Sequence, residues 1–137
     1  IAPGEPPRAL SALELMMGIT ICYDMRFPEL YRRLAEAGAE LFSVPSAFTV
    51  PTGQAHWHTL LRARAIENLA WVIAPAQVGE HPNGRRTFGH SLIINPWGEI
   101  VAERTGGPGV IFARLDRADA AQRRRQFPAL EHRVLKG

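Results

Sequence analysis

The chain has 137 residues, of which 46% are hydrophobic and 21% are charged, and these values fit one ordinary globular domain and exclude a disordered segment. The net charge is +3 and the basic excess gathers at residues 123–125, so a nucleic-acid-binding protein, which needs a wider basic face, is not expected. No stretch is long and apolar enough to predict a membrane partner, and a single cysteine excludes an internal disulfide and favours a cytoplasmic protein.

The first third of the chain is predicted to form a loop followed by strand, helix and strand. Three prolines within residues 1–12 each remove a backbone donor, so this stretch is expected to be a loop. Apolar and β-branched residues predict a buried strand over 13–21. A helix is expected over 28–37 because Pro28 suits its first position and Gly38 its end, and a second strand follows over 40–45.

The remainder of the chain continues with further helices and strands. Residues 46–54 are predicted to form a loop because Pro51 and Gly53 interrupt any periodicity. The pattern then predicts a helix over 55–68, a buried strand over 70–78, a turn over 81–84, a hairpin over 91–95 and 99–103, a last strand over 110–115, and a helix that Asp116 caps and that ends near Gln126.

This order of elements predicts an α/β fold. Strand, helix, strand, helix and strand followed by a hairpin place the helices on one face of the sheet. The other face of that sheet is then expected to be bare.

Cys22 lies where the first predicted strand ends and the first predicted helix is about to begin. A thiol at such a junction faces unpaired backbone amides and a partial positive charge, and both favour the nucleophilic thiolate. A lone cysteine is also a common small core residue. The residues alone leave both roles open.

The segment around this cysteine resembles the nucleophile motif of the nitrilase-related carbon–nitrogen hydrolases. The motif reads CYDMRFPEL over residues 22–30. The resemblance continues through PSAF (45–48), HW (56–57), LRARAIEN (61–68), AQ (76–77), GHS (89–91) and NPWGE (95–99). It covers nearly the whole chain and is greatest to the branch that hydrolyses short ω-amides of 2-oxo acids, including deaminated glutathione.

The resemblance implies a fold and a reaction. The family's fold is a four-layer αββα sandwich, of which residues 1–137 resemble the C-terminal portion of one domain. Cys22 would be the nucleophile that forms a thioester and releases ammonia from a small-molecule amide, and the backbone N–H of Tyr23 would help to hold the oxyanion. The resemblance implies neither a metal nor an organic cofactor.

The family's other catalytic groups, two glutamates and a lysine, precede the cysteine motif. Only Glu5 and Glu14 precede Cys22 here, neither in a matching context, and Lys136 matches no motif position. The N-terminal half of the domain is therefore expected to be absent, and residues 1–137 alone are expected to be incomplete and inactive.

Four further residues match positions around the family's site. Arg26 would bind the substrate carboxylate, although it could instead pair with Glu67. Phe48 and Thr52 would line the pocket, or they could pack within their loop. Glu67 would brace the nucleophile loop through an arginine rather than act as the general base.

Two other uses of the side chains compete with this interpretation. A cysteine–histidine dyad with His56, His58 or His90 is possible in principle, although no partner motif for the histidine is recognisable. A metal pair at His56 and His58 is disfavoured because residues two apart on a helix point away from each other.

The resemblance also implies a homodimer or higher oligomer through helices 28–37 and 55–68. The alternative to an enzyme is a non-catalytic subunit or remnant that binds a partner chain through the bare face of its sheet.

Overall fold

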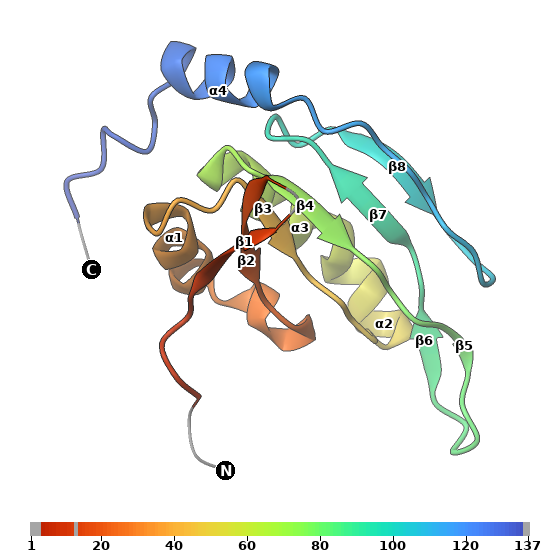
Figure 1. Ribbon diagram of the computed structural model, residues 1–137. Helices are drawn as coiled ribbons and strands as arrows, with labels where there is room; N and C mark the ends of the chain where they lie inside the picture. The colour runs from red at the N-terminus through yellow and green to blue at the C-terminus, as the bar shows by residue number, and fades with distance from the viewer. Residues whose placement is uncertain (1–3, 13, 136–137) are drawn as a thin grey trace.

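A computed structural model describes residues 4–12 and 14–135, which form a six-stranded mixed sheet with helices packed on it (Figure 1). The strand order is β1-β2-β3-β4-β7-β8, in which β2, β3 and β4 are parallel and the remaining pairs are antiparallel. The strands are β1 (Ala9–Ala12), β2 (Leu15–Ile19), β3 (Leu41–Ser43), β4 (Trp71–Ala74), β7 (Ser91–Ile94) and β8 (Ile100–Arg104). Strands β5 (Val78–Glu80) and β6 (Arg86–Phe88) form a separate hairpin.

Helices α1 (Pro28–Glu36) and α3 (His58–Asn68) cover one face of this sheet. Their buried residues Tyr31, Leu34 and Leu61 pack with inward-facing residues of the central strands, among them Phe42 and Val72. The predicted boundaries of α1 are confirmed to within one residue, and Gly38 adopts the left-handed conformation that ends this helix. The side chain of Asp116 accepts a hydrogen bond from the amide of Asp119, as predicted for the cap of α4 (Arg117–Gln126).

The N-terminal prediction was wrong in one respect, because part of the expected loop is a strand. Strand β1 pairs with β2 in an antiparallel hairpin that turns at Glu14, which has a φ of 63°. The prolines of the segment all precede Ala9, so every residue of β1 keeps its backbone donor. The predicted strand over 13–21 is therefore shorter, and Leu13 lies outside the described residues.

The loop predicted over 46–54 was also wrong, because a helix already begins within it. A helical turn, α2 (Val50–Thr52), continues through a π-helical turn (Gly53–Trp57) into α3. Pro51 occupies the first turn, where a backbone N–H has no partner within the helix. Gly53 adopts ordinary helical angles and lies so close to Phe88 that a methyl group there would overlap the ring. Neither residue breaks the helix.

The strand predicted over 110–115 does not form, although its alternating pattern has a structural meaning. Ile111, Ala113 and Leu115 pack against the second face of the sheet, together with Ala120 of α4, so this face is partly covered rather than bare. Val110 and Phe112 point outward and are 72% and 85% exposed. The segment is extended, but among the described residues it has no strand to pair with.

Tyr31 joins α1 to the end of β2 through a buried hydrogen bond. Its hydroxyl lies 2.8 Å from the Thr20 hydroxyl, and Thr20 Oγ1 donates to the carbonyl of Ser43 at 3.0 Å. Because Thr20 has one proton to donate, Tyr31 is the donor of the shared bond. This chain of hydrogen bonds fixes the backbone two residues before Cys22.

We expect Tyr31 to make the protein sensitive to alkaline pH. Burial raises the pKa of Tyr31 to about 12 from its ordinary 10. A raised folded-state pKa means that the stabilisation is complete below pH 10 and is lost as the pH rises from 10 to 12, by about 2–3 kcal/mol in total. Urea unfolding at pH 9 and pH 11.5 should show this loss in the native protein and a smaller loss in Tyr31→Phe. Equal losses in both proteins would contradict the assignment.

Candidate active site

The ends of the three parallel strands form an open hollow of about 560 Å³ that contains Cys22. Parallel strands bring their carboxyl ends to one edge of a sheet, which is where ligands bind in many α/β proteins. Cys22 follows β2, Ser46 follows β3 and Ala76 follows β4, and all three line the hollow. Ser91, at the start of the antiparallel β7, closes one side and accepts a hydrogen bond from the Ala76 amide at 2.8 Å.

The backbone at Cys22 has the conformation of a sharp strand-to-helix turn. Its φ is 49°, in the left-handed region that non-glycine residues rarely adopt and that clusters at functional sites. The Cys22 amide donates to the carbonyl of Pro45 at 2.9 Å, which continues the parallel ladder to this residue. The side chain is partly buried and borders the hollow, so the thiol is neither sealed in the core nor fully exposed.

Residues Cys22–Arg26 form a short 3-10 turn that opens at the thiol. Its first internal hydrogen bond runs from the Asp24 amide to the Ile21 carbonyl at 3.0 Å, and the Asp24 carboxylate accepts from the Ile21 amide at 2.8 Å. The amide of Tyr23 precedes that first bond, at the end of the turn where donors have no partner within the helix. The Tyr23 N–H thus belongs to the residue that follows Cys22, at the end of the turn where backbone donors are unpaired within the helix.

Arg64 on α3 supports this turn from beneath. Arg64 as a residue is 5% exposed, and its guanidinium lies over the ring of Tyr31 and donates from Nε to the carbonyl of Met25 at 2.9 Å. Its Nη1 also donates to Glu67 Oε1 at 2.6 Å. Glu67 therefore contacts the nucleophile turn through an arginine, and that arginine is Arg64.

Three residues that were predicted to contact the substrate do not line the hollow: Arg26, Phe48 and Thr52. The guanidinium of Arg26 lies 5.3 Å from the ring centroids of both Tyr23 and Phe48. Phe48 is only 7% exposed and packs against Trp57 in the core. The hydroxyl of Thr52 lies 2.8 Å from that of Thr49, within their own turn.

Arg26 has no carboxylate partner among the described residues. Its Nη1 instead lies 3.3 Å from Nδ1 of His56. The alternative pairing with Glu67 is not observed, because Glu67 contacts Arg64. The guanidinium is therefore available to an acidic ligand.

No acid–base group other than the thiol lines this hollow within the described part of the chain. Glu5 contacts Arg8, and Glu14 lies at the opposite end of β2 from Cys22. His58 and His90 bind Glu103 instead of Cys22. Lys136 is outside the described residues. The described lining of the hollow therefore offers the Cys22 thiol and no second group that could move protons.

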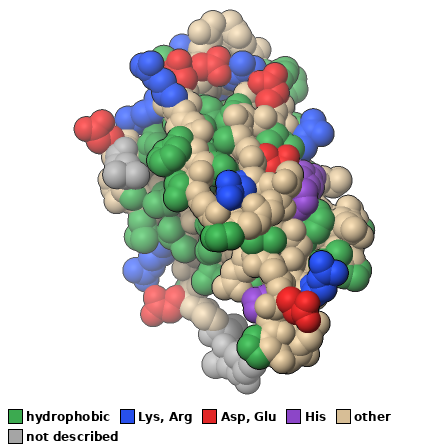
Figure 2. All heavy atoms as spheres, turned by 90° about the vertical axis from the view of Figure 1, so that its right-hand side faces the viewer, with side chains coloured by type: hydrophobic (Ala, Val, Ile, Leu, Met, Phe, Trp, Pro, Cys, Tyr) green, Lys and Arg blue, Asp and Glu red, His purple; other side chains and the backbone are tan. Residues whose placement is uncertain are grey.

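The surface adds two observations. Over residues 4–12 and 14–135, no helix is both long and apolar enough to cross a membrane. On the face shown in Figure 2, acidic and basic side chains are interspersed.

The fold and this site define an α/β protein with a cysteine at the carboxyl edge of its parallel strands. The sequence profile described as "Carbon-nitrogen hydrolase" matches residues 2–125. The chain belongs to the carbon–nitrogen hydrolase family.

This chain is similar to individual members of the family in both sequence and structure. The deaminated glutathione amidase of Mus musculus is 50% identical over 129 residues, which cover 94% of this chain and 39% of that protein. Among solved structures, the C. elegans NitFhit protein matches with a TM-score of 0.94 at 43% identity, over 98% of this chain and 32% of that one.

Saccharomyces cerevisiae Nit3, described as a member of branch 10 of the nitrilase superfamily, matches with a TM-score of 0.90 at 36% identity, over 98% of this chain and 50% of that one. The α/β nitrilase-like fold predicted from the sequence is therefore confirmed. The chain spans about two fifths of the length of the mouse protein and half of Nit3.

Proposed function

We propose that this chain provides the nucleophile of an amidase, which hydrolyses the C–N bond of a small ω-amide such as a 2-oxo acid amide or deaminated glutathione. The observation that carries the proposal is Cys22, a partly buried thiol in a left-handed backbone conformation beside an open hollow. The similarity to proteins named deaminated glutathione amidase supports the reaction class.

The proposed reaction has two steps. The Cys22 thiolate attacks the amide carbonyl carbon, and the Tyr23 N–H stabilises the oxyanion that forms. The C–N bond then breaks, the nitrogen takes a proton and leaves as ammonia, and the acyl group remains on sulfur as a thioester. Water attacks the thioester, which releases a carboxylic acid and restores the thiol. The group that transfers these protons would come from outside the described lining of the hollow.

Substrate selection is proposed to depend on Arg26. Its guanidinium has no carboxylate partner among the described residues, and a guanidinium binds a carboxylate through two parallel hydrogen bonds. The aromatic rings of Tyr23 and Phe48 hold it in place. A substrate with a free carboxylate at the end opposite its amide fits this arrangement, and Phe48 and Thr52 would then shape the region between them.

The direct test is a covalent adduct. The protein, expressed with whatever sequence naturally flanks these 137 residues, should form a thioester on Cys22 when mixed with a 2-oxo acid ω-amide and quenched in acid. Peptide mass spectrometry should place the adduct on the peptide that contains Cys22. A protein that releases ammonia while its modification maps elsewhere would refute the proposal.

Residues 1–137 alone should show negligible turnover. Groups that act as a unit lose most of their rate when one is missing, and no acid–base group besides the thiol lines the described hollow. Purified 1–137 should release no more ammonia than its own Cys22→Ala variant in a coupled assay. Measurable ammonia release that depends on Cys22 would show that this chain already holds a complete site.

We also propose a cytoplasmic homodimer or higher oligomer that associates through α1 and α3. The single cysteine is free, as is usual in a reducing compartment. Helix α3 exposes Ile66, which is 47% accessible, on its outer side. Light scattering on the protein should give at least twice the mass of one chain.

The second candidate is a non-catalytic chain that binds a partner through the second face of its sheet. Ile111, Ala113 and Leu115 already cover part of this face, and the exposed side chains of Val110 and Phe112, at 72% and 85%, lie on the outer side of that segment, where they would extend the contact with a partner. Ammonia release by the protein with its natural flanking sequence, and loss of that release in Cys22→Ala, would decide for the enzyme.

A further inference from the structure

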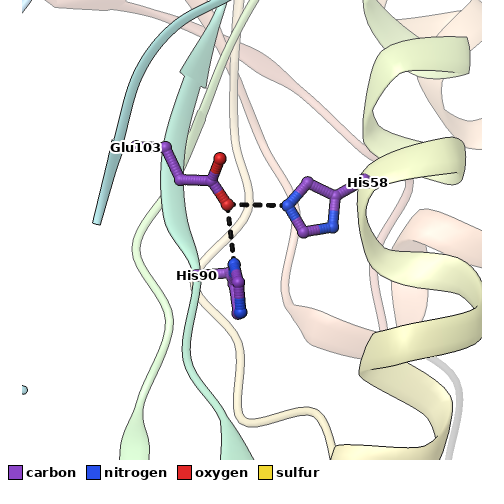
Figure 3. Close-up of side chains that lie close together, drawn as sticks. All are labelled: His58, His90 and Glu103. Atoms are coloured by element: carbon purple, nitrogen blue, oxygen red, sulfur yellow. Dashed lines mark hydrogen bonds and ion pairs between the residues drawn. The ribbon is translucent and has the colours of Figure 1, made fainter. Parts of the chain in front are cut away.

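Three potential metal ligands from distant parts of the sequence meet between α3 and β8 (Figure 3). His58 is the first residue of α3, His90 immediately precedes β7, and Glu103 lies on β8. Both imidazole rings point at one carboxylate oxygen: His58 Nε2 and His90 Nδ1 each lie 2.7 Å from Glu103 Oε1. The three donor atoms lie within 4.8 Å of one another.

The surrounding structure holds these side chains in place. His90 has a φ of 58°, and the fully buried Trp57 fixes that turn by donating from Nε1 to the His90 carbonyl at 2.8 Å. The ring of Phe88 stacks on the His90 ring with centroids 4.1 Å apart. The edge of His58 meets the same Phe88 ring. Both imidazoles are therefore oriented before any ligand arrives.

The electrostatics of the cluster keep its carboxylate charged. Partial burial raises the pKa of Glu103, but the hydrogen bonds from His58 and His90 outweigh this and leave the pKa below its usual value. The side chains of His58, His90 and Glu103 are 33%, 24% and 27% exposed, so solvent reaches the cluster from one side. None of the three lines the hollow that contains Cys22.

We propose that His58 Nε2, His90 Nδ1 and Glu103 Oε1 bind a divalent transition-metal ion of the zinc class. Two imidazole nitrogens and one carboxylate oxygen form a donor set that suits Zn²⁺. Bonds of about 2.0–2.1 Å in a tetrahedral site separate the donors by about 3.3 Å, so the two present contacts would open by roughly half an ångström. The solvent-exposed side leaves the fourth position to water.

Metal binding requires a change of tautomer that the cluster allows. Because a carboxylate oxygen only accepts, the two 2.7 Å contacts require an N–H from each ring, whereas a metal needs the lone pair of that nitrogen. The proton can move to the other ring nitrogen, because His58 Nδ1 and His90 Nε2 accept no hydrogen bond and make none within the described part of the chain. The bound ion would link α3 to the β7–β8 hairpin.

The test is a titration of zinc into the metal-free protein with its natural flanking sequence, and calorimetry measures the binding. We expect one Zn²⁺ per chain, and we expect Co²⁺ to give the visible absorption of a tetrahedral site. We expect zinc affinity to fall by about 100-fold or more in each of three ligand variants, His58→Gln, His90→Ala and Glu103→Gln. Loss of a group that only hydrogen-bonds to a metal ligand already costs about 10- to 100-fold in metal affinity, and these variants lose a ligand itself.

Three variants serve as controls. His81→Ala removes a histidine whose one side-chain hydrogen bond within the described part of the chain is to Thr87, and His132→Ala removes one in the C-terminal segment, so both should bind zinc as the native protein does. Cys22→Ala should also bind normally, which separates this site from the thiol. Circular dichroism checks that each ligand variant is folded. Absence of zinc binding, or binding that survives in the folded His58→Gln and Glu103→Gln variants, would overturn the proposal.

Discussion

Replacing Cys22 with alanine is expected to lower the rate of amide hydrolysis by about 10⁴-fold or more in the protein that carries its natural flanking sequence. The alanine variant keeps the backbone hydrogen bond to Pro45 but has no atom that can attack a carbonyl. Ammonia release measured with a coupled assay should fall to the background of buffer, while substrate binding measured by calorimetry should persist.

The comparison variants separate chemistry from folding. Cys22→Ser keeps the size of the side chain but offers a hydroxyl that ionises far less readily than a thiol, so it should be almost as inactive. Arg125→Ala removes an exposed charge on α4, far from the chemistry, and should retain full activity. If Cys22→Ala kept a tenth of the native rate, the thiol would not be the nucleophile.

Cys22 shows how much of the site the sequence can predict. A β-branched run that ends at a cysteine and continues to a proline–glutamate pair describes a strand-to-helix junction, and the structure has one there. The left-handed conformation of Cys22 is not predictable in the same way. It arises because the ladder with Pro45 and the 3-10 turn must both be satisfied at one residue.

Other features depend on contacts that no local pattern records. His58, His90 and Glu103 share no spacing that resembles a ligand motif, and only the pairing of β7 with β8 and the packing of α3 bring them together. The strand register of the predicted hairpin places Glu103 opposite Leu92, on the face of the sheet that the helices cover. This pairing is the feature from which the position of Glu103 could be predicted.

The strand predicted over 110–115 does not form, although its local pattern was interpreted correctly. Its alternation correctly separates residues that pack on the sheet from Val110 and Phe112, which face outward. Alternation reports two faces, however, and a strand also needs a neighbour to receive its hydrogen bonds. Within the described residues that neighbour is missing, so the chain stays extended without becoming a strand.

Loss of the Arg64 side chain should destabilise the fold strongly. This charged side chain is 6% exposed, and it uses separate nitrogens for the Met25 carbonyl and the Glu67 carboxylate. Arg64→Met replaces it with a side chain of similar length that can pack against Tyr31 but cannot donate. The Met25 carbonyl then loses its donor, and Glu67 loses its ion pair and keeps a 3.5 Å hydrogen bond from Asn68 Nδ2. At buried positions such losses cost about 1–3 kcal/mol and 3–5 kcal/mol respectively.

We expect Arg64→Met to lower the free energy of unfolding by about 3 kcal/mol, because Glu67 is 30% exposed and regains some hydration. Arg62→Met is the matched control. Arg62 lies two residues away on the exposed side of α3, and its one hydrogen bond to the described residues goes to the Gly98 carbonyl, so its loss should cost about 1 kcal/mol or less. Urea unfolding of both variants measures the difference.

A double substitution isolates the ion pair from the rest of the network. Adding Glu67→Gln to Arg64→Met removes the orphaned charge, so the double variant should be more stable than the sum of the single losses predicts. The rate at which a thiol reagent modifies Cys22 should change with Arg64→Met and not with Arg62→Met, because only Arg64 holds the turn that carries the thiol. The two arginine variants could instead be equally destabilised and leave the reactivity of the thiol unchanged. That result would mean that the Met25 carbonyl does not need the Arg64 guanidinium. The turn of Cys22 would then be held by its own backbone hydrogen bonds.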